Sequence, residues 1–269
     1  MRRSDGPVLL LLVLGLAGCA GASAGLAGEV SYKKDAKGNF ELGQRELEGH
    51  NYTDAAQYFQ YTKNKFPYSH YASLAELRLA DSNFDQEKFT EAIDGYKNFI
   101  KDHPTHAKVD YAGFRIGLSH YKDIPSDFFL LPPSYEKDQQ QLSDAQLSLK
   151  DFLASYPASS YVPEAKKLLA DVRKRLARHE LYVGQYYEQH GHPKAAAWRY
   201  EGLAQDYGDT PYASEAKDRA DRLFAKLGNS ERRHKAPPAD SSKSTPLQDP
   251  WPSPLPDPTP HQLPKPPLF

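Results

Sequence analysis

Residues 79–104 read LADSNFDQEKFTEAIDGYKNFIKDHP, and their pattern indicates the fold class. The apolar residues of this stretch recur at spacings of three and four, which is the period of a helix rather than the alternation of a strand. It ends at Pro104, and Thr105 follows as a residue that can cap the next helix. The same punctuation recurs, with steps of 37, 53 and 51 residues, at Phe66-Pro67-Tyr68-Ser69, Tyr156-Pro157-Ala158-Ser159 and Tyr207-Gly208-Asp209-Thr210. The chain between residues 40 and 227 is therefore predicted to be a helical repeat without strands.

These repeats fit the tetratricopeptide template of ~34 residues, which places small residues where paired helices touch, an aromatic between them and Pro at the turn. In the quoted stretch the template positions are Leu79, Ala80, Ala92, Tyr96 and Phe99. The corresponding positions are Leu42, Gly43, Ala55 and Phe59 in the first unit, and Val183, Gly184, Tyr187, Ala196, Tyr200 and Leu203 in the fourth. The third unit has Gly117 on its first helix, an insertion at residues 123–141, and then Ala145, Leu149 and Phe152.

After Pro211 a last helix carries Ala213, Ala216, Ala220, Leu223 and Phe224 without a second partner, as a terminal cap does. The predicted fold is all-α, an α-solenoid of about four tetratricopeptide helix pairs plus a C-terminal capping helix. We interpret nearly all of the Ala, Gly and aromatic template positions as packing residues rather than a site.

A stack of such repeats leaves a concave groove lined by the first helix of each pair, and an aromatic, apolar groove suits peptide recognition. By template position, the candidate groove residues are Phe40, Gln44, Leu47, Leu77, Asp81, Phe84, Phe114, Leu118 and Tyr121. The alternative for each of them is that it faces the neighbouring repeat and belongs to the core.

Composition and motifs exclude several classes of function. Lys and Arg number 34 against 35 Asp and Glu, so the chain lacks the basic excess of a nucleic-acid binder. One Cys excludes an intramolecular disulfide and thiolate metal clusters. The pairs His103/His106 and His190/His192 have no third ligand at a recognised spacing, and no phosphate loop or Gly-x-Ser-x-Gly elbow occurs. We therefore predict no enzyme, no metal and no cofactor.

A basic run, Arg173, Lys174, Arg175 and Arg178, lies beside Asp171 and Glu180. We interpret it as a solvated helical face. Docking of an acidic partner is the less favoured alternative.

The N-terminus has the pattern of a bacterial lipoprotein. Arg2 and Arg3 precede an apolar run at residues 8–16, which is too short to span a ~30 Å hydrocarbon layer and is typical of a signal peptide. Leu16-Ala17-Gly18-Cys19 resembles the lipobox, in which the chain is cut before the Cys and acylated on it. Cys19 is thus the predicted lipid attachment point, and Ala20, in place of an Asp, favours the outer membrane.

The lipobox and the repeats together resemble the BamD (ComL-like) family of tetratricopeptide lipoproteins, over about residues 30–227. The segments that carry the resemblance are Asn51-Tyr52 with Ala55-Ala56, His103-Pro104-Thr105-His106 with Asp110-Tyr111, Phe128-Phe129, Tyr156-Pro157-Ala158-Ser159-Ser160-Tyr161, Arg175-Leu176-Ala177, Tyr186-Tyr187, Arg199 with Glu201-Gly202, and Asp206-Tyr207 with Asp209-Thr210.

The resemblance implies a scaffold without catalytic activity, lipid-anchored on the periplasmic face of the outer membrane and working in β-barrel assembly beside other lipoproteins. It implies that the C-terminal repeats dock on the last periplasmic domain of a BamA-type barrel, and that the N-terminal repeats help to recognise unfolded outer-membrane proteins. By the match, Arg199, Glu201 and Gly202 form the receptor-facing segment. The alternative for Arg199 is an ion pair with Glu201 or Glu188.

The sequence departs from the family pattern at Gly208, which replaces a Pro, and in its tail. Of the 22 prolines, 12 lie after residue 228, which favours an extended polyproline II chain and excludes a helix. An inert tail is the default interpretation, and contact with the cell wall or other envelope proteins is the alternative. The predicted organisation is a signal peptide at 1–18, an acylated Cys and flexible tether at 19–29, the repeat domain at 30–227 and a Pro-rich disordered tail at 228–269.

Two other functions stay open at this stage. One is a different tetratricopeptide envelope lipoprotein, of the Tol-Pal-associated kind, although the N-terminal coiled coil usual for that kind is not visible. The other is a protein that binds or cuts the cell wall, for which no catalytic constellation was found.

Overall fold

The computed structural model describes residues 30–125 and 133–228. These residues form a series of α-helices and one short 3-10 helix. In chain order they are α1 (Ala36–Glu48), α2 (Tyr52–Lys65), α3 (His70–Asp85), α4 (Phe89–Asp102), α5 (Val109–Lys122), η1 (Ser134–Glu136), α6 (Gln140–Ser155), α7 (Val162–Gln189), α8 (Pro193–Asp206) and α9 (Ala213–Leu227).

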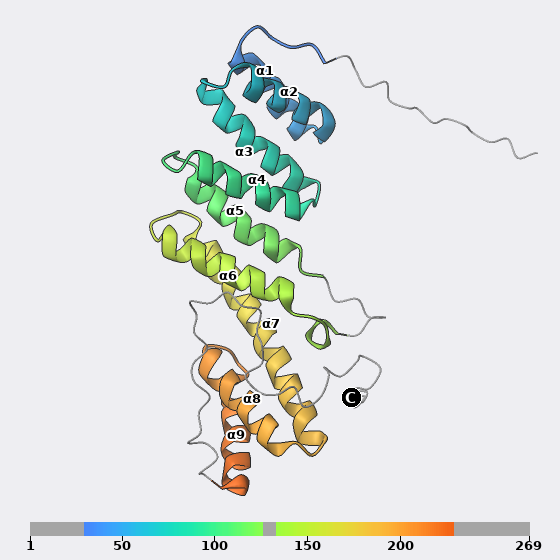
Figure 1. The fold of residues 1–269 in the computed structure, drawn as a ribbon, viewed down its shortest axis with the longest axis vertical. Coiled ribbons are helices and arrows are strands. Elements are labelled where there is room, and N and C mark those ends of the chain that lie inside the picture. Colours follow the sequence, from blue (N-terminus) through green and yellow to red (C-terminus); the bar gives the residue numbers. More distant parts are fainter. Residues whose placement is uncertain (1–29, 126–132, 229–269) are drawn as a thin grey trace, which may run out of the picture.

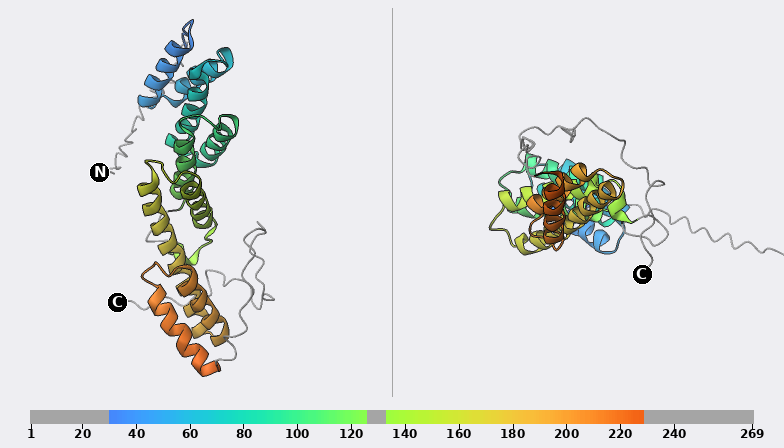
Figure 2. Two further views of the ribbon diagram at one scale, coloured as in Figure 1. Left: turned by 90° about the vertical axis from the view of Figure 1, so that its left-hand side faces the viewer. Right: turned by 90° about the horizontal axis from the view of Figure 1, so that it is seen from below.

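The helices stack in chain order along one long axis, with α1 at one end and α9 at the other (Figures 1 and 2). Each helix packs on the next, and the pairs are α1 with α2, α3 with α4, α5 with α6, and α7 with α8, while α9 closes the stack. This confirms the predicted all-α solenoid of four helix pairs and a capping helix. The insertion in the third unit is also confirmed, since α5 ends at Lys122 and α6 begins at Gln140.

Small and aromatic residues meet within each pair, as the repeat template requires. Phe59 of α2 lies against Gly43 of α1, where an added Cβ would be 2.7 Å from Phe59 Cε1. Ala55 and Phe59 are fully buried in one core cluster with Phe40 and Ala75. The core is therefore a chain of small clusters, one at each seam, rather than a single centre.

The expected capping residues are confirmed at one turn and wrong at the others. Ser69 caps α3, since its Oγ accepts a hydrogen bond of 3.2 Å from the Tyr71 backbone N–H. The cap positions of α5, α7 and α9 are instead Lys108, Tyr161 and Tyr212, and none of these three makes a side-chain cap bond. Ser159 lies one turn before α7, where its Oγ accepts a hydrogen bond of 3.3 Å from the Tyr161 backbone N–H and donates to Asp110 Oδ2. Thr210 donates to the Tyr207 carbonyl oxygen. Thr105 lies outside the cap position of α5.

The helix α7 joins the third and fourth pairs. It runs unbroken through 28 residues. Ala165, Val172 and Leu176 of its first part lie in the core cluster of the third pair, while Ala177 and Leu181 lie in that of the fourth. One helix thus belongs to two successive cores.

Candidate functional site

Several of the candidate groove residues are in the core. Phe40, Leu77 and Phe114 are only 6%, 3% and 3% exposed, and each sits in a seam cluster. The expectation that they line an open groove is therefore corrected. The physical reason is that the first helix of a pair has two packed sides, one toward its partner and one toward the next repeat. A template position fixes the helix face but does not tell a groove from a seam.

The groove assignment of Asp81 is also corrected. Asp81 is only 4% exposed, and its carboxylate is hydrogen-bonded between the second and third repeats. Its Oδ1 accepts hydrogen bonds from the hydroxyls of Tyr96 (2.7 Å) and Tyr111 (2.8 Å). Its Oδ2 accepts one of 2.7 Å from Arg78 Nη1. The Arg115 guanidinium lies 3.7 Å from the same carboxylate. A buried carboxylate needs such partners, so Asp81 is a structural residue of the seam.

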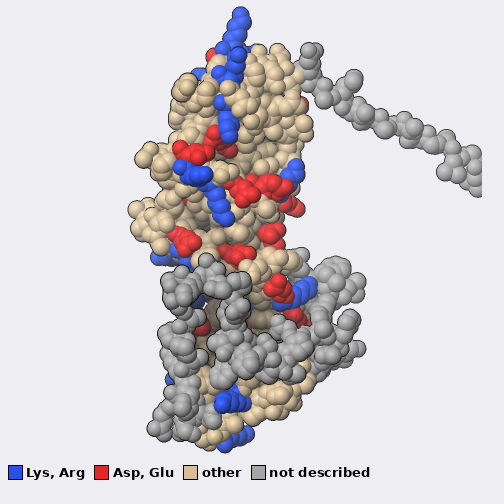
Figure 3. Space-filling model, viewed as in Figure 1, with Lys and Arg blue, Asp and Glu red and all other residues tan. Residues whose placement is uncertain are grey.

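The remaining groove candidates are half-buried. They are Gln44, Leu47, Phe84, Leu118 and Tyr121. The face of Phe84 is already covered, since the Arg115 guanidinium carbon lies 3.7 Å from its ring centroid. The surface around it thus combines charge with aromatic rings. On the face shown in Figure 3, acidic and basic side chains also intermingle over the first repeats.

The residues Arg199, Glu201 and Gly202 lie together on α8. Arg199 Nη1 contacts Glu180 Oε2 of α7 at 3.2 Å, with the two side chains 39% and 25% exposed. Glu201 accepts a hydrogen bond of 2.9 Å from Gln205 Nε2. Glu188, one of the two expected partners of Arg199, is instead 3.0 Å from Arg219 Nη1. Arg199 therefore forms an internal ion pair, but with Glu180, which is neither of the two acids expected from the sequence, Glu201 and Glu188.

Gly202 is unusual among the helical glycines. It lies inside α8, yet an added Cβ would meet no described atom within 4 Å. Glycine in a helix interior is less favourable than alanine by ~0.5–1 kcal/mol. Packing among the described residues gives no reason for glycine at this position. Gly202 follows Arg199 by three residues, so both lie on one face of the helix.

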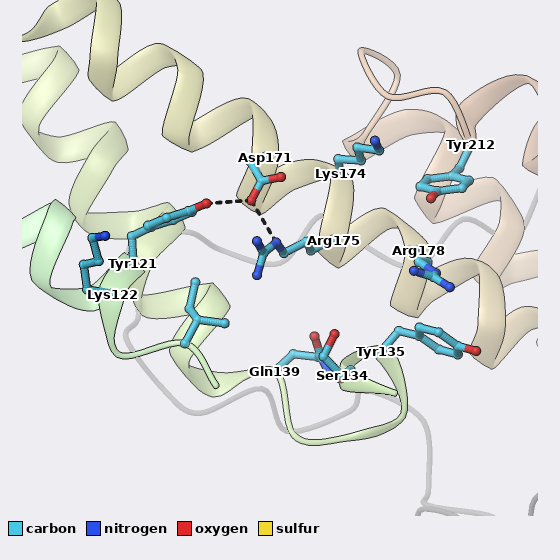
Figure 4. Close-up of a pocket in the computed structure, with 11 residues that line it drawn as sticks. Tyr121, Lys122, Ser134, Tyr135, Gln139, Asp171, Lys174, Arg175, Arg178 and Tyr212 are labelled. Carbon is cyan, nitrogen blue, oxygen red and sulfur yellow. Dashed lines mark hydrogen bonds and ion pairs between the residues drawn. The ribbon is translucent and has the colours of Figure 1, made fainter. Parts of the chain in front are cut away.

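A cavity of about 450 Å³ opens between the end of α5, η1 and the middle of α7. Its lining combines tyrosines and cations, including Tyr121, Tyr135, Tyr212, Lys122, Lys174, Arg175 and Arg178. Figure 4 shows Tyr121 and Arg175 converging on Asp171, at 3.0 Å and 2.8 Å from its Oδ2. Burial, and then the hydrogen bond to Asp171, raise the pKa of Tyr121.

The cations of this cavity differ in their partners. Arg175 is paired with Asp171, whereas Lys122, Lys174 and Arg178 have no ion pair with any carboxylate of residues 30–125 or 133–228. Arg178 lies over the ring of Tyr135, with its guanidinium carbon 4.2 Å from the centroid. His179 donates through Nδ1 to the Tyr135 carbonyl oxygen at 2.7 Å and so holds η1 against α7. The cavity thus combines aromatic rings with several cations that have no acidic partner among the described residues.

This cavity was largely missed by sequence reasoning, which interpreted the basic run as one solvated face. The structure divides that run. Arg173 turns away and donates from Nε to Asp209 Oδ2 at 2.8 Å, while Lys174 and Arg178 face the cavity. The signal that could have found it is the helical spacing of positions 171, 174, 175 and 178, which puts them on one face.

Comparison with known proteins supplies the family. The family model of YfiO, described as an outer membrane lipoprotein, matches residues 32–237, which include every helix of the described chain. The chain belongs to the YfiO family of outer-membrane lipoproteins.

Several relatives of this chain carry one name, "Outer membrane protein assembly factor BamD". The relative from Pasteurella multocida is 25% identical over 191 residues, covering 70% of this chain and 73% of its own. The one from Neisseria meningitidis (serogroup A) is 25% identical and covers 82% and 85%. The one from Caulobacter vibrioides is 23% identical and covers 82% and 70%. The resemblance to the BamD family is thereby confirmed.

Other features of the described chain bear on its site. His103 Nε2 lies 2.8 Å from Glu76 Oε2, but within residues 30–125 and 133–228 no three His, Cys, Asp or Glu side chains form a group able to hold a metal. Cys19, the tether, Phe128-Phe129 and the Pro-rich tail lie outside the described residues.

Among the helices in the described part of the chain, none has the length and apolarity needed to cross a membrane.

Proposed function

We propose that this protein is a non-catalytic scaffold of the machinery that assembles β-barrel proteins in the outer membrane. The observation that carries the proposal is the YfiO match along the whole solenoid, together with relatives named as assembly factors at the outer membrane. A solenoid suits the role, because stacked repeats expose an extended surface to several partners at once. The same match disfavours the Tol-Pal-associated and cell-wall-binding alternatives.

The proposed docking surface for a BamA-type periplasmic domain is the face of α8 that carries Arg199, Glu201 and Gly202. Two observations support this proposal. The Arg199 guanidinium is still 39% exposed beside Glu180, so it can also bind a partner's carboxylate. The open space over Gly202 leaves room for a partner backbone to approach closely.

Unfolded outer-membrane proteins are proposed to contact the half-buried residues of the first three repeats. These residues are Gln44, Leu47, Phe84, Leu118 and Tyr121. Their rings and partly exposed apolar atoms support weak binding of an extended chain. The proposed location is the periplasmic face of the outer membrane, with acylated Cys19 as the anchor.

The experiment that tests the function is a pull-down of the mature lipoprotein from mild-detergent membrane extracts. We expect to recover a large outer-membrane barrel that has periplasmic domains, along with further lipoproteins. An unrelated acylated lipoprotein of similar size serves as the control bait. Recovery of Tol-Pal components without a barrel would instead support the alternative.

A further inference from the structure

The cavity between α5, η1 and α7 shares Tyr121 with the proposed substrate surface, but its cations and its other tyrosines have no part in the scaffold role proposed above. Three tyrosines contribute to its lining, namely Tyr121, Tyr135 and Tyr212. Its volume of about 450 Å³ lies in the range of pockets that bind small ligands or short peptide segments. Lys122, Lys174 and Arg178 bring positive charge to it without acidic partners among the described residues.

We propose that this cavity binds the proline-rich segment of the same chain, residues 246–260. Prolines alternate through most of this segment, as in Pro254-Leu255-Pro256-Asp257-Pro258, so it favours polyproline II. Grooves lined with aromatic rings bind polyproline II chains, because flat rings pack on the prolines and little conformational entropy is lost.

Charge also matches the segment to the cavity. The charged residues between positions 246 and 260 are Asp249 and Asp257, both acidic. Lys174 and Arg178 are one helical turn apart on α7 and face the cavity. Carboxylates placed near exposed cations on a tyrosine-rich surface gain both ion pairing and hydrogen bonds.

The segment is tethered at a suitable distance. Tyr212 lines the cavity and directly precedes α9, a helix of 15 residues that spans ~22 Å before the tail begins. The linker of residues 229–245 has a root-mean-square length of ~23 Å as a random coil. Because the linker length matches the span, the effective concentration of the segment at the cavity is on the order of millimolar. A weak contact is enough at that concentration.

Two other cavities of the described chain lack this match. The cavity beside α9 is lined by Glu215, Asp218 and Asp221 with Arg222, so it would repel the aspartates of the segment. The cavity near the start of α5 contains His103 and His106 but no tyrosine among its lining residues. Charge and aromatic rings therefore favour the cavity on α7.

Trp251 gives a direct test in the full chain, because it lies inside the segment. The protein has two tryptophans, Trp198 and Trp251, so subtracting the fluorescence of the Trp251→Phe variant isolates the signal of Trp251. We expect acrylamide to quench Trp251 at least about twofold less in the parent chain than in a free peptide of residues 246–260. In the double variant Lys174→Glu/Arg178→Glu, acrylamide should quench Trp251 as strongly as it does in the free peptide.

A matched control and a charge exchange make the test specific. Lys166→Glu/Lys167→Glu alters the same helix at exposed positions that do not line the cavity. In this control variant, Trp251 should be protected from acrylamide as well as it is in the parent chain. Exchanging the charges, by adding Asp249→Lys/Asp257→Lys to Lys174→Glu/Arg178→Glu, should restore protection. Far-ultraviolet circular dichroism checks that each variant is folded.

Three outcomes would overturn the proposal. The first is a parent chain whose Trp251 is quenched as fully as the free peptide. The second is equal loss of protection in the cavity and control variants. The third is protection that grows with protein concentration, which would place the segment on a second copy.

Discussion

Asp81 and Tyr96 are joined by a hydrogen bond of 2.7 Å that lies inside the second repeat, with the carboxylate side chain 5% exposed. Tyr111 of the third repeat donates to the same oxygen, so this carboxylate connects two repeats. A seam between repeats is the interface on which the stability of a solenoid depends.

The substitution Asp81→Ala is expected to destabilise the protein by about 3 kcal/mol. It removes the acceptor of two buried hydroxyls and leaves Arg115 in the seam without its nearest buried carboxylate. Urea unfolding followed by circular dichroism measures the loss. Asp94→Ala, at an exposed position of the neighbouring helix, should change the free energy of unfolding by less than ~0.5 kcal/mol. Equal effects of the two variants would contradict this account.

Gly184→Ala and Gly202→Ala should change stability in opposite directions. A Cβ at Gly184 would lie 2.4 Å from Tyr200 Cε1, so alanine overpacks the seam and should destabilise the protein by ~1–3 kcal/mol. At Gly202 the same atom meets no described neighbour, and alanine should stabilise the helix by up to ~1 kcal/mol. The midpoints of urea unfolding measure both, and shifts of the same sign would refute the packing geometry.

Stability should fall as the pH is lowered below about 6.5, in part through His120. Burial lowers the pKa of His120, and Asp144 offsets this only in part. In the window between its folded pKa and ~6.5 the unfolded chain therefore binds more protons than the native one, so acid favours unfolding. His120→Gln should flatten the dependence of the unfolding free energy on pH. Burial also lowers the pKa of His106, so some dependence remains. Identical pH profiles for parent and variant would show that His120 does not contribute.

Arg199→Ala tests the proposed docking surface. We expect helix content to be unchanged and binding to the periplasmic domains of a BamA-type barrel to weaken at least tenfold, or ~1.4 kcal/mol. Loss of the half-exposed pair with Glu180 should by itself lower stability by less than ~1 kcal/mol. Isothermal calorimetry measures the affinity, and Arg45→Ala, an exposed arginine on α1, is the control. An affinity within twofold of the parent would mean that Arg199 serves only its internal pair.

Cys19→Ser tests the anchor. Without the thiol the chain cannot be acylated, so no lipid mass should be found on it and it should leave the outer-membrane fraction. Mass spectrometry and membrane fractionation give the two readouts. Ala22→Ser, a nearby change that keeps the thiol, should behave as the parent does. A Cys19→Ser protein that stays in the outer membrane with unchanged mass would rule out this anchor.

The fold could be predicted because packing within a helix pair depends on local spacing. Ala55, Tyr96 and their equivalents follow the template, and their burial is confirmed. The groove could not be predicted in the same way. Phe40 and Leu77 occupy the expected helix faces. Whether such a face meets solvent or a neighbouring repeat depends on the rotation between successive helix pairs. That rotation cannot be predicted from the local spacing of residues.

The charge pairs of the candidate site could not be predicted from the sequence either. The basic run was visible in the sequence, but the pairing of Arg173 with Asp209 joins residues 36 positions apart. Long-range partners of this kind decide which charges stay available, and they follow only from the tertiary arrangement. Arg199 is a second example, because its partner Glu180 lies on α7, 19 positions away in the chain, and is neither of the two acids considered first.

The unbroken run of α7 has a mechanical consequence. A helix of 28 residues is ~42 Å long, and its two halves are anchored in two different cores. A force or a rotation imposed on α8 therefore reaches the third repeat through a continuous rod, without a joint at which it could be absorbed. If a partner docks at the C-terminal end and a chain is held by the third repeat, as proposed above, the length and pitch of this one helix would set the distance and angle between them.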